Sequence, residues 1–239
     1  MASAGDDDAV ALHPATLAAL AEFRREKEEA EARAAHEAED DSATLLLSEN
    51  YGESQFWYSE ETSLFLAEEA CWCREQLGRG EVVFLSSPSA YKAYRSLARR
   101  RGGAQAAHVL EYDARFAVFG EAFVKYDYNH PLEGLPEGLL GQCSVVMLDP
   151  PFLNRDCLAG FAETVRALQL PTGETRVLLA TGAVQIAFAR ELLGLRPTQR
   201  PILHAGGRLS NPFALFTNYE HQEALRGWDV EAERASGLA

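Results

Sequence analysis

The sequence has 239 residues and a net charge of −14 at pH 7, from 36 acidic side chains against 22 lysines and arginines. Its hydrophobic fraction of 47% is enough to bury the core of one domain of ordinary size. No stretch approaches the roughly 18 consecutive apolar residues of a membrane-spanning helix. The acidic amino terminus also lacks the basic and apolar segments of a secretory signal. These features exclude a membrane or secreted protein and predict a cytoplasmic one.

The excess of acid also bears on the partner. A nonspecific grip on nucleic acid depends on lysines and arginines that neutralise phosphates, so nucleic acid is not the expected partner. One basic cluster, Arg95 with residues 99–101, lies at the end of a predicted helix, where it complements the helix dipole. The charge therefore favours a basic protein as substrate, and it leaves the oligomeric state open.

The cysteines are few and irregularly spaced. A zinc site of the usual kind would need a second pair of cysteines or histidines at ligand spacing, and the sequence has none, so no metal is expected. We predict reduced thiols in or near the core, because cysteine is usually buried. This applies to all four residues: Cys71, Cys73, Cys143 and Cys157.

Residues 1–45 differ from the rest and are predicted to form an acidic, helical N-terminal extension. From Leu17 to Asp40 they consist mostly of Ala, Glu and Arg without Gly or Pro, which is typical of a helix. The extension is either an appendage that docks one turn on the body or a helix that binds a partner. The first reading is favoured, because helical faces that are charged all round are usually just solvated.

Residues 46–222 are predicted to form the main domain and residues 223–239 a C-terminal tail. Ser59 is a typical N-cap, followed by acids in the first turn of a helix that runs to Leu77. Short apolar runs then alternate with helical patterns. Strands are expected at 82–85, 109–110, 123–126, 144–148, 176–180, 198–204 and 212–219, and further helices at 90–101, 115–120, 156–170 and 182–193.

This alternation predicts an α/β fold with a mainly parallel, seven-stranded, Rossmann-like sheet. Strands joined through helices form right-handed crossovers, and continuous apolar runs indicate strands that are covered on both faces. The last two strands have no helical pattern between them, only a loop with glycines at 206–207. They are therefore expected to form an antiparallel pair at one edge of the sheet.

Polar side chains follow each of the first four predicted strands. Ligands of open α/β sheets bind at the carboxyl ends of the strands, so these groups are expected on one rim. An acid after the second strand is placed to accept hydrogen bonds from ribose hydroxyls, and one after the third to meet an adenine amino group. The candidates are Ser86, Ser87 and Ser89, then Glu111 and Asp113, then Asp127 and Asn129, and finally Asp149.

The most informative segment is Asp149-Pro150-Pro151-Phe152, which follows the fourth strand. Two prolines remove two backbone donors and fix φ, which leaves outward carbonyls in a rigid arrangement. Together, a rigid carbonyl, a carboxylate that only accepts hydrogen bonds and an aromatic ring suit a planar or cationic amino group. In this position we therefore predict that the segment holds an amino nitrogen as acceptor.

The tetrapeptide resembles the hallmark of the amino-group methyltransferases, which include the adenine-N6 enzymes of DNA and RNA. Three more segments sharpen the resemblance: residues 54–59 (SQFWYS), 111–116 (EYDARF) and 126–129 (YDYN). Over about residues 45–220 the chain resembles a eukaryotic branch of that family, the lysine methyltransferases of translation elongation factor 1A. The resemblance implies the seven-strand S-adenosylmethionine-dependent methyltransferase fold and transfer of a methyl group to a lysine ε-amine of that factor.

The resemblance also implies the roles of individual residues. Asp149 would orient the neutral amine, the Pro150 carbonyl would take a second N–H, and Phe152 beside Pro151 would line the lysine channel. Glu111 would bind the ribose hydroxyls and Asp127 the adenine amino group. Further cofactor contacts are implied for Tyr128, for Ser86 and Ser87 under the methionine part, and for Phe56, Trp57 and Tyr58 in the segment that closes over the cofactor.

One segment departs from the family pattern, and two alternative functions remain. The loop after the first strand reads LSSPS at 85–89, where such enzymes usually carry glycines. An inactive scaffold with the same fold has only this loop in its favour. An adenine-N6 methyltransferase that acts on DNA or RNA would need a basic groove and a recognition region, and the sequence shows neither.

Overall fold

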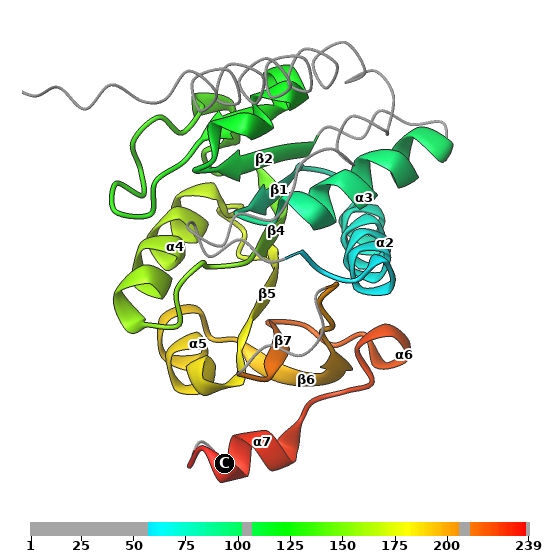
Figure 1. Ribbon diagram of the computed structural model, residues 1–239, viewed down its shortest axis with the longest axis vertical. Coiled ribbons are helices and arrows are strands. Elements are labelled where there is room, and N and C mark those ends of the chain that lie inside the picture. The colour runs from blue at the N-terminus through cyan, green and yellow to red at the C-terminus, as the bar shows by residue number, and fades with distance from the viewer. Residues whose placement is uncertain (1–56, 102–106, 206–210, 238–239) are drawn as a thin grey trace, which may run out of the picture. The chain divides into compact units, whose positions relative to one another are not determined.

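The computed structural model describes residues 57–101, 107–205 and 211–237 (Figure 1). The chain divides into two compact units, Met1–Leu47 and Ser48–Ala239, and every element described below belongs to the second. The predicted helix at 17–40 and Phe56 lie outside the described residues. The domain boundaries inferred from the sequence stay a prediction.

The second unit alternates strands and helices along the chain. The α-helices are α2 (Glu60–Leu77), α3 (Pro88–Arg100), α4 (Arg155–Leu168), α5 (Ile186–Leu193), α6 (Gln222–Leu225) and α7 (Val230–Ala235). Short 3-10 helices are η3 (Ala114–Ala122), η4 (Glu137–Leu139) and η5 (Ala183–Gln185). The strands are β1 (Glu81–Leu85), β2 (Ala107–Glu111), β3 (Phe123–Lys125), β4 (Cys143–Leu148), β5 (Arg176–Gly182), β6 (Arg196–Pro201) and β7 (Phe213–Thr217).

The strands form one seven-stranded sheet in the order β3-β2-β1-β4-β5-β7-β6. β7 runs antiparallel to both of its neighbours, β5 and β6, and the other pairings are parallel. This confirms the predicted fold class, including the antiparallel pair at one edge. The strand order reverses between β1 and β4, where ligands bind in open α/β sheets.

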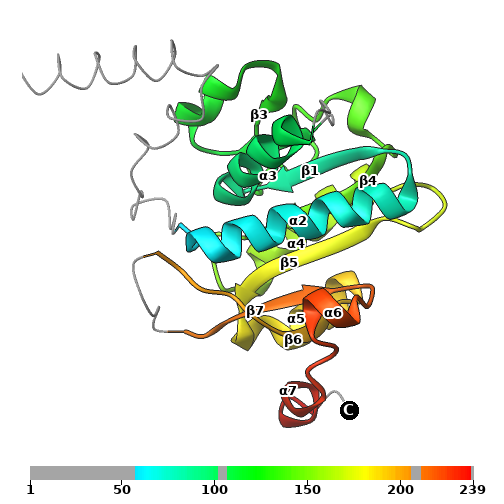
Figure 2. The same cartoon turned by 90° about the vertical axis from the view of Figure 1, so that its right-hand side faces the viewer.

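Helices cover both faces of the sheet (Figures 1 and 2). On one face, α4 and α5 pack over a cluster of apolar side chains that includes Leu85, Leu148 and Leu179. On the other face lie α2 and α3, and Phe84 contacts the rings of Tyr91 and Tyr94 of α3 at 5.7 and 5.2 Å. Burial on both faces explains why the strands read as continuous apolar runs.

Local signals account for the ends of α2. The Ser59 hydroxyl accepts a hydrogen bond from the Thr62 N–H at 3.2 Å, as expected of an N-cap. At the other end Gly78 adopts a left-handed conformation with φ 65°, and its N–H donates to the Arg74 carbonyl. The helix predicted from Ser59 to Leu77 is confirmed.

The strand predicted at 198–204 is wrong at both ends, because β6 starts at Arg196 and leaves the sheet after Pro201. The residues that follow satisfy their backbone groups elsewhere. The Leu203 carbonyl accepts from the Ser59 N–H at 2.8 Å, and the Ala205 N–H donates to the Trp57 carbonyl at 2.9 Å. An antiparallel bridge joins Tyr58 to His204. The chain therefore leaves the sheet to pair with the segment that precedes α2.

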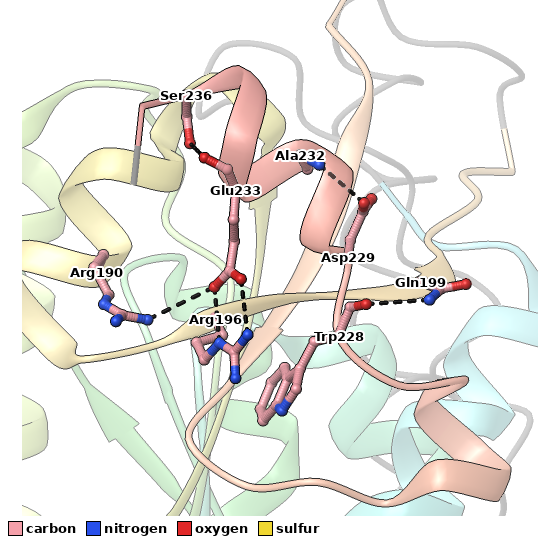
Figure 3. Close-up of polar contacts among 8 residues, drawn as sticks. All are labelled: Arg190, Arg196, Gln199, Trp228, Asp229, Ala232, Glu233 and Ser236. Carbon is pink, nitrogen blue, oxygen red and sulfur yellow. Dashed lines mark hydrogen bonds and ion pairs between the residues drawn. The ribbon is translucent and has the colours of Figure 1, made fainter. Parts of the chain in front are cut away.

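The C-terminal segment packs against β6, the edge strand of the sheet (Figure 3). Trp228 forms an antiparallel bridge with Thr198, and the Arg196 guanidinium lies 4.6 Å from the centre of the Trp228 ring. From α7 the Glu233 carboxylate accepts two hydrogen bonds of 2.7 Å from Arg196 and lies 3.6 Å from Arg190. The segment thus covers an edge that would otherwise offer unpaired backbone groups.

Three further features concern the whole described part of the chain. All four cysteines are buried and free of disulfide bonds, which confirms that they are thiols of the core. Within the described residues, no three potential ligands lie close enough to hold a metal ion. No helix among them is long and apolar enough to cross a membrane.

Candidate active site at the carboxyl ends of the strands

Asp149 lies at the point where the strand order reverses. Its N–H donates to the Leu85 carbonyl at 3.1 Å, so the chain continues the β1–β4 ladder for one residue beyond β4. Pro150, the next residue, is buried, and its fixed φ sets the direction in which the loop leaves the sheet. The Asp149 side chain is surrounded by protein atoms, while the residue keeps partial access to solvent.

The environment of Asp149 changes its acidity. Burial raises the pKa of this carboxyl to about 8, the nearby Tyr58 hydroxyl lowers it, and the charge of Glu111 raises it. A carboxyl with a pKa close to neutrality exchanges a proton readily at physiological pH. Such pKa values cluster at functional sites, so the structure supports a chemical role for Asp149.

Tyr58 is buried beside Asp149, with an exposed fraction of 4%. Burial and the Asp149 carboxylate hold the pKa of Tyr58 well above its ordinary value, and the Ser87 side chain lowers it. The hydroxyl lies near both side chains, yet no described group completes a well-formed hydrogen bond to it. An unpaired buried hydroxyl costs free energy, so we expect it to bond to a bound ligand or to Asp149 once the site is filled.

The turn after β1 contains no glycine, because a serine takes the backbone conformation that glycine usually adopts there. Ser86 adopts the left-handed conformation, φ 52°, that glycine usually takes, and its N–H donates to the Leu110 carbonyl at 2.7 Å. Ser87 is the N-cap residue that precedes α3. Its hydroxyl is buried and has no hydrogen-bond partner among the described residues. A buried hydroxyl of this kind fits a polar group of a ligand.

The acids after β2 and β3 shape their own turns. Glu111 Oε1 accepts from the backbone N–H groups of Tyr112 and Asp113 at 2.8 and 3.2 Å. Asp127 Oδ1 accepts from the N–H and the side-chain amide of Asn129, both at 2.9 Å. These bonds fix both carboxylates at the carboxyl ends of their strands, where they fit the hydroxyl and amino donors of a nucleoside. That role stays a prediction.

An aromatic wall stands beside the Asp149 loop. Phe152 is 41% exposed, and its ring meets the Tyr128 ring edge-on, with centroids 6.0 Å apart. Tyr128 in turn lies against Phe161 of α4, at 6.3 Å. The close approach depends on Gly160, where an added Cβ would lie 2.3 Å from the Tyr128 carbonyl oxygen. Phe152 thus presents a supported apolar surface to solvent.

The structure brings Tyr58 and Glu111 close enough to Asp149 to change its pKa, and Ser87 close enough to Tyr58 to lower the pKa of that hydroxyl. The other predicted residues lie around this group. Trp57 precedes Tyr58, and its carbonyl accepts a hydrogen bond from the Ala205 N–H. Asp127 and Tyr128 follow β3. Phe152 follows the prolines Pro150 and Pro151.

Two features of the site were missed from the sequence. The segment 203–205 pairs with residues 57–59, and no local pattern predicts contact between segments so far apart in the chain. Thr181, near the end of β5, has a buried hydroxyl without a hydrogen-bond partner among the described residues. Its position just after the apolar run of the fifth strand was a signal that could have drawn attention to it.

Comparison with known proteins shows which family the chain resembles. Residues 49–221 match the family described as probable N6-adenine methyltransferase. EEF1A lysine methyltransferase 1 of Mus musculus is 37% identical, over 97% of this chain and 100% of the mouse protein. A protein-lysine N-methyltransferase of Dictyostelium discoideum is 39% identical, over 77% of this chain and 79% of that protein.

A solved structure shows the same fold at low identity. The branched-chain polyamine synthase C9 mutein of Thermus thermophilus, crystallised with N4-aminopropylspermidine and 5'-methylthioadenosine, superposes with a TM-score of 0.53. The two sequences are 18% identical, and the superposed part covers 77% of this chain and 62% of the synthase chain. The likeness supports the fold, and the sequence relatives decide the family. The chain belongs to the probable N6-adenine methyltransferase family, together with the EEF1A lysine methyltransferase 1 proteins.

Proposed function

We propose that the chain transfers a methyl group from S-adenosylmethionine to a lysine ε-amine of translation elongation factor 1A, in the cytoplasm. The observation that carries the proposal is the buried carboxyl of Asp149, set between rigid proline backbone and the Tyr58 hydroxyl where the strand order reverses. The acceptor is taken from the relatives, which are named as lysine methyltransferases of this factor.

The residues around Asp149 fit the methyl donor. We expect Glu111 and Asp127 to hold the ribose hydroxyls and the adenine amino group. The unpaired Ser87 hydroxyl after β1 suits the polar end of the methionine part. When bound, S-adenosylmethionine supplies an electrophilic methyl group. The chain has to present a neutral amine to it, in line.

The acceptor amine must first lose a proton. A free lysine amine has a pKa of about 10.4, so its neutral form is scarce at pH 7. Desolvation beside the aromatic surface of Phe152 lowers the pKa of an entering lysine. The released proton passes to solvent. Asp149, which acts purely as an acceptor only when it is ionised, and the Pro150 carbonyl then accept the two remaining N–H groups and aim the lone pair. Most of the rate acceleration is expected to come from this positioning.

The test uses radiolabelled S-adenosylmethionine, the purified full chain and lysate from cells that lack the enzyme, followed by mass spectrometry of the labelled protein. We expect label on a lysine of elongation factor 1A. The Asp149→Ala variant should lose transfer and still bind S-adenosylmethionine in calorimetry, which would locate the chemistry at this carboxyl.

The description of the matching family makes nucleic acid the necessary control. DNA and RNA oligonucleotides that contain adenine are offered under the same conditions. Label on an oligonucleotide and none on any lysate protein would overturn the lysine assignment in favour of adenine. Absence of binding to S-adenosylmethionine would instead favour an inactive scaffold.

A further inference from the structure

The segment that carries Tyr58 is held in place by the connection between β6 and β7. Two backbone hydrogen bonds join residues 57–59 to residues 203–205, at 2.8 and 2.9 Å. A third bond, of 3.1 Å, runs from the Leu203 N–H to the Thr62 hydroxyl in the first turn of α2. The backbone of this pairing therefore fixes where Tyr58 enters the site, whatever side chain occupies position 204.

The side chain of His204 adds a contact that the backbone does not provide. Its ring lies 5.2 Å from the Tyr58 ring and 4.6 Å from the Phe213 ring, which it meets edge-on. Phe213 begins β7 and pairs with Gly182 at the carboxyl end of β5. The His204 ring thus contacts Tyr58 and also Phe213, which belongs to the rigid sheet.

The contact matters because of what Tyr58 covers. The Tyr58 hydroxyl lies near the Asp149 carboxyl and the Ser87 side chain, and the charge of Glu111 raises the pKa of Asp149. Asp149 keeps its raised pKa through burial, and Tyr58 is one of the groups packed near it. If the Tyr58 ring were free to turn away, we expect that more water would reach the carboxyl and that its orientation would be less fixed.

We propose that His204 is a positioning residue for methyl transfer, which holds the Tyr58 ring against Asp149 so that the carboxyl meets the acceptor amine in a fixed orientation. The inference rests on the proposed function. His204 itself is only half-buried and lies outside the main apolar core, so we expect its replacement to leave the sheet and the flanking helices intact.

Two variants separate positioning from general packing. His204→Ala removes the ring, whereas His204→Phe keeps an aromatic ring between Tyr58 and Phe213. Both variants lack the imidazole, so a difference between them cannot come from its own titration. His108→Ala is the matched control, because His108 lies at the amino end of β2, at the far end of the sheet from Asp149.

The first measurement is steady-state transfer to the protein substrate. We expect kcat of His204→Ala to fall at least about tenfold, because small misplacements near reacting groups cost up to about 100-fold. The affinity for S-adenosylmethionine should stay within about twofold. His204→Phe should recover kcat to within about threefold of the wild type, and His108→Ala should match the wild type.

The second measurement needs no substrate, so it remains informative if the proposed function fails. Because the pKa of Asp149 is raised in the folded state, the ligand-free protein loses stability as pH rises from about 4, the pKa in the unfolded chain, to about 8, the pKa in the folded chain. Water around Asp149 would return its pKa toward the ordinary value. The fall in Tm from pH 6 to 8.5 should therefore be smaller in His204→Ala than in His204→Phe or the wild type. Equal kcat in the two variants, or an equal pH dependence of Tm, would overturn the proposal.

Discussion

Asp149 binds its proton more tightly in the folded chain than in the unfolded chain, because burial raises its pKa to about 8. The stability that this proton contributes is fully present below the unfolded pKa, and it is lost as pH rises through the folded pKa. Asp149→Asn removes the titration. We expect the Tm of the ligand-free variant to fall less from pH 6 to 8.5 than that of the wild type, by about 2–4 °C for each kcal/mol recovered. Calorimetric scans at both pH values measure this.

The matched control for this prediction is Glu174→Gln. Hydrogen bonds from Thr172 and Arg79 lower the pKa of Glu174, so its stabilising contribution is lost only as pH falls below the range tested. The control should therefore keep the wild-type fall in Tm between pH 6 and 8.5. If Asp149→Asn also kept it, the Asp149 carboxyl would not be the buried group that titrates.

Gly160 tests the support of the turn that carries Asp127 and Tyr128. A methyl group at position 160 would come within 2.3 Å of the Tyr128 carbonyl oxygen, and backbone cannot yield cheaply. We expect Gly160→Ala to cost about 1–3 kcal/mol of unfolding free energy, as overpacking typically does. The affinity for S-adenosylmethionine should also fall, because the turn shifts. Chemical denaturation and calorimetric titration measure the two effects.

A second glycine provides the control for this substitution. Gly138 lies in η4, with nothing within 4 Å of an added Cβ and no left-handed backbone. Gly138→Ala should leave both the stability and the affinity close to wild type. Equal behaviour of the two variants would show that the contact between α4 and the Tyr128 turn is not tight.

At the scale of elements, local signals predicted most of the fold. The N-cap Ser59 and the helix-ending Gly78 act through neighbours in the sequence, so the bounds of α2 followed from the sequence alone. The path of residues 202–205 did not follow from the sequence, because their backbone groups pair with residues 57–59. An apolar run indicates that a segment is buried, but it does not indicate which partner satisfies the backbone hydrogen bonds of that segment.

The candidate site divides in the same way. The positions of Glu111, Asp127 and Asp149 after their strands follow from the α/β pattern, because carboxyl ends of parallel strands share one edge. The left-handed Ser86 and the proximity of Tyr58 to Asp149 do not. The first is a backbone conformation that serine rarely adopts, and the second depends on how the segment before α2 crosses the sheet.

The C-terminal segment is expected to stabilise the fold without contributing to catalysis. Arg196 lies at the start of β6, the edge strand three positions away from β4 in the sheet, and Arg190 lies near the end of α5. Loss of their shared partner in Glu233→Ala removes two charge-assisted hydrogen bonds, at a cost of about 1.5–3 kcal/mol for each bond to a charged group before relaxation.

The measurement pairs chemical denaturation with kcat at a temperature well below Tm. Glu233→Ala should unfold at lower denaturant concentration, with kcat unchanged. The control is Glu231→Ala, an exposed acid of the same helix. A loss of kcat in the folded Glu233 variant would mean that the C-terminal segment acts on the active site.

For the whole molecule, charge is unevenly distributed along the chain. Residues 1–47 carry 12 acids and 4 lysines and arginines, so they supply a net −8 of the total of −14. Opposite charges on two proteins raise the rate of encounter, and salt screens this effect. If the substrate is a basic protein, the acidic extension should attract it, whatever structure the extension adopts.

We therefore expect KM for the protein substrate to rise about threefold or more between 50 and 200 mM salt, since the Debye length falls across this range. KM for S-adenosylmethionine should change little. Deletion of residues 1–47 should flatten the salt dependence, because the remaining chain carries only −6. Calorimetric binding of S-adenosylmethionine shows that the shortened chain is folded. A salt dependence that survives the deletion unchanged would place the attraction on the methyltransferase domain instead, because the charge that responds to salt would then be the charge that remains.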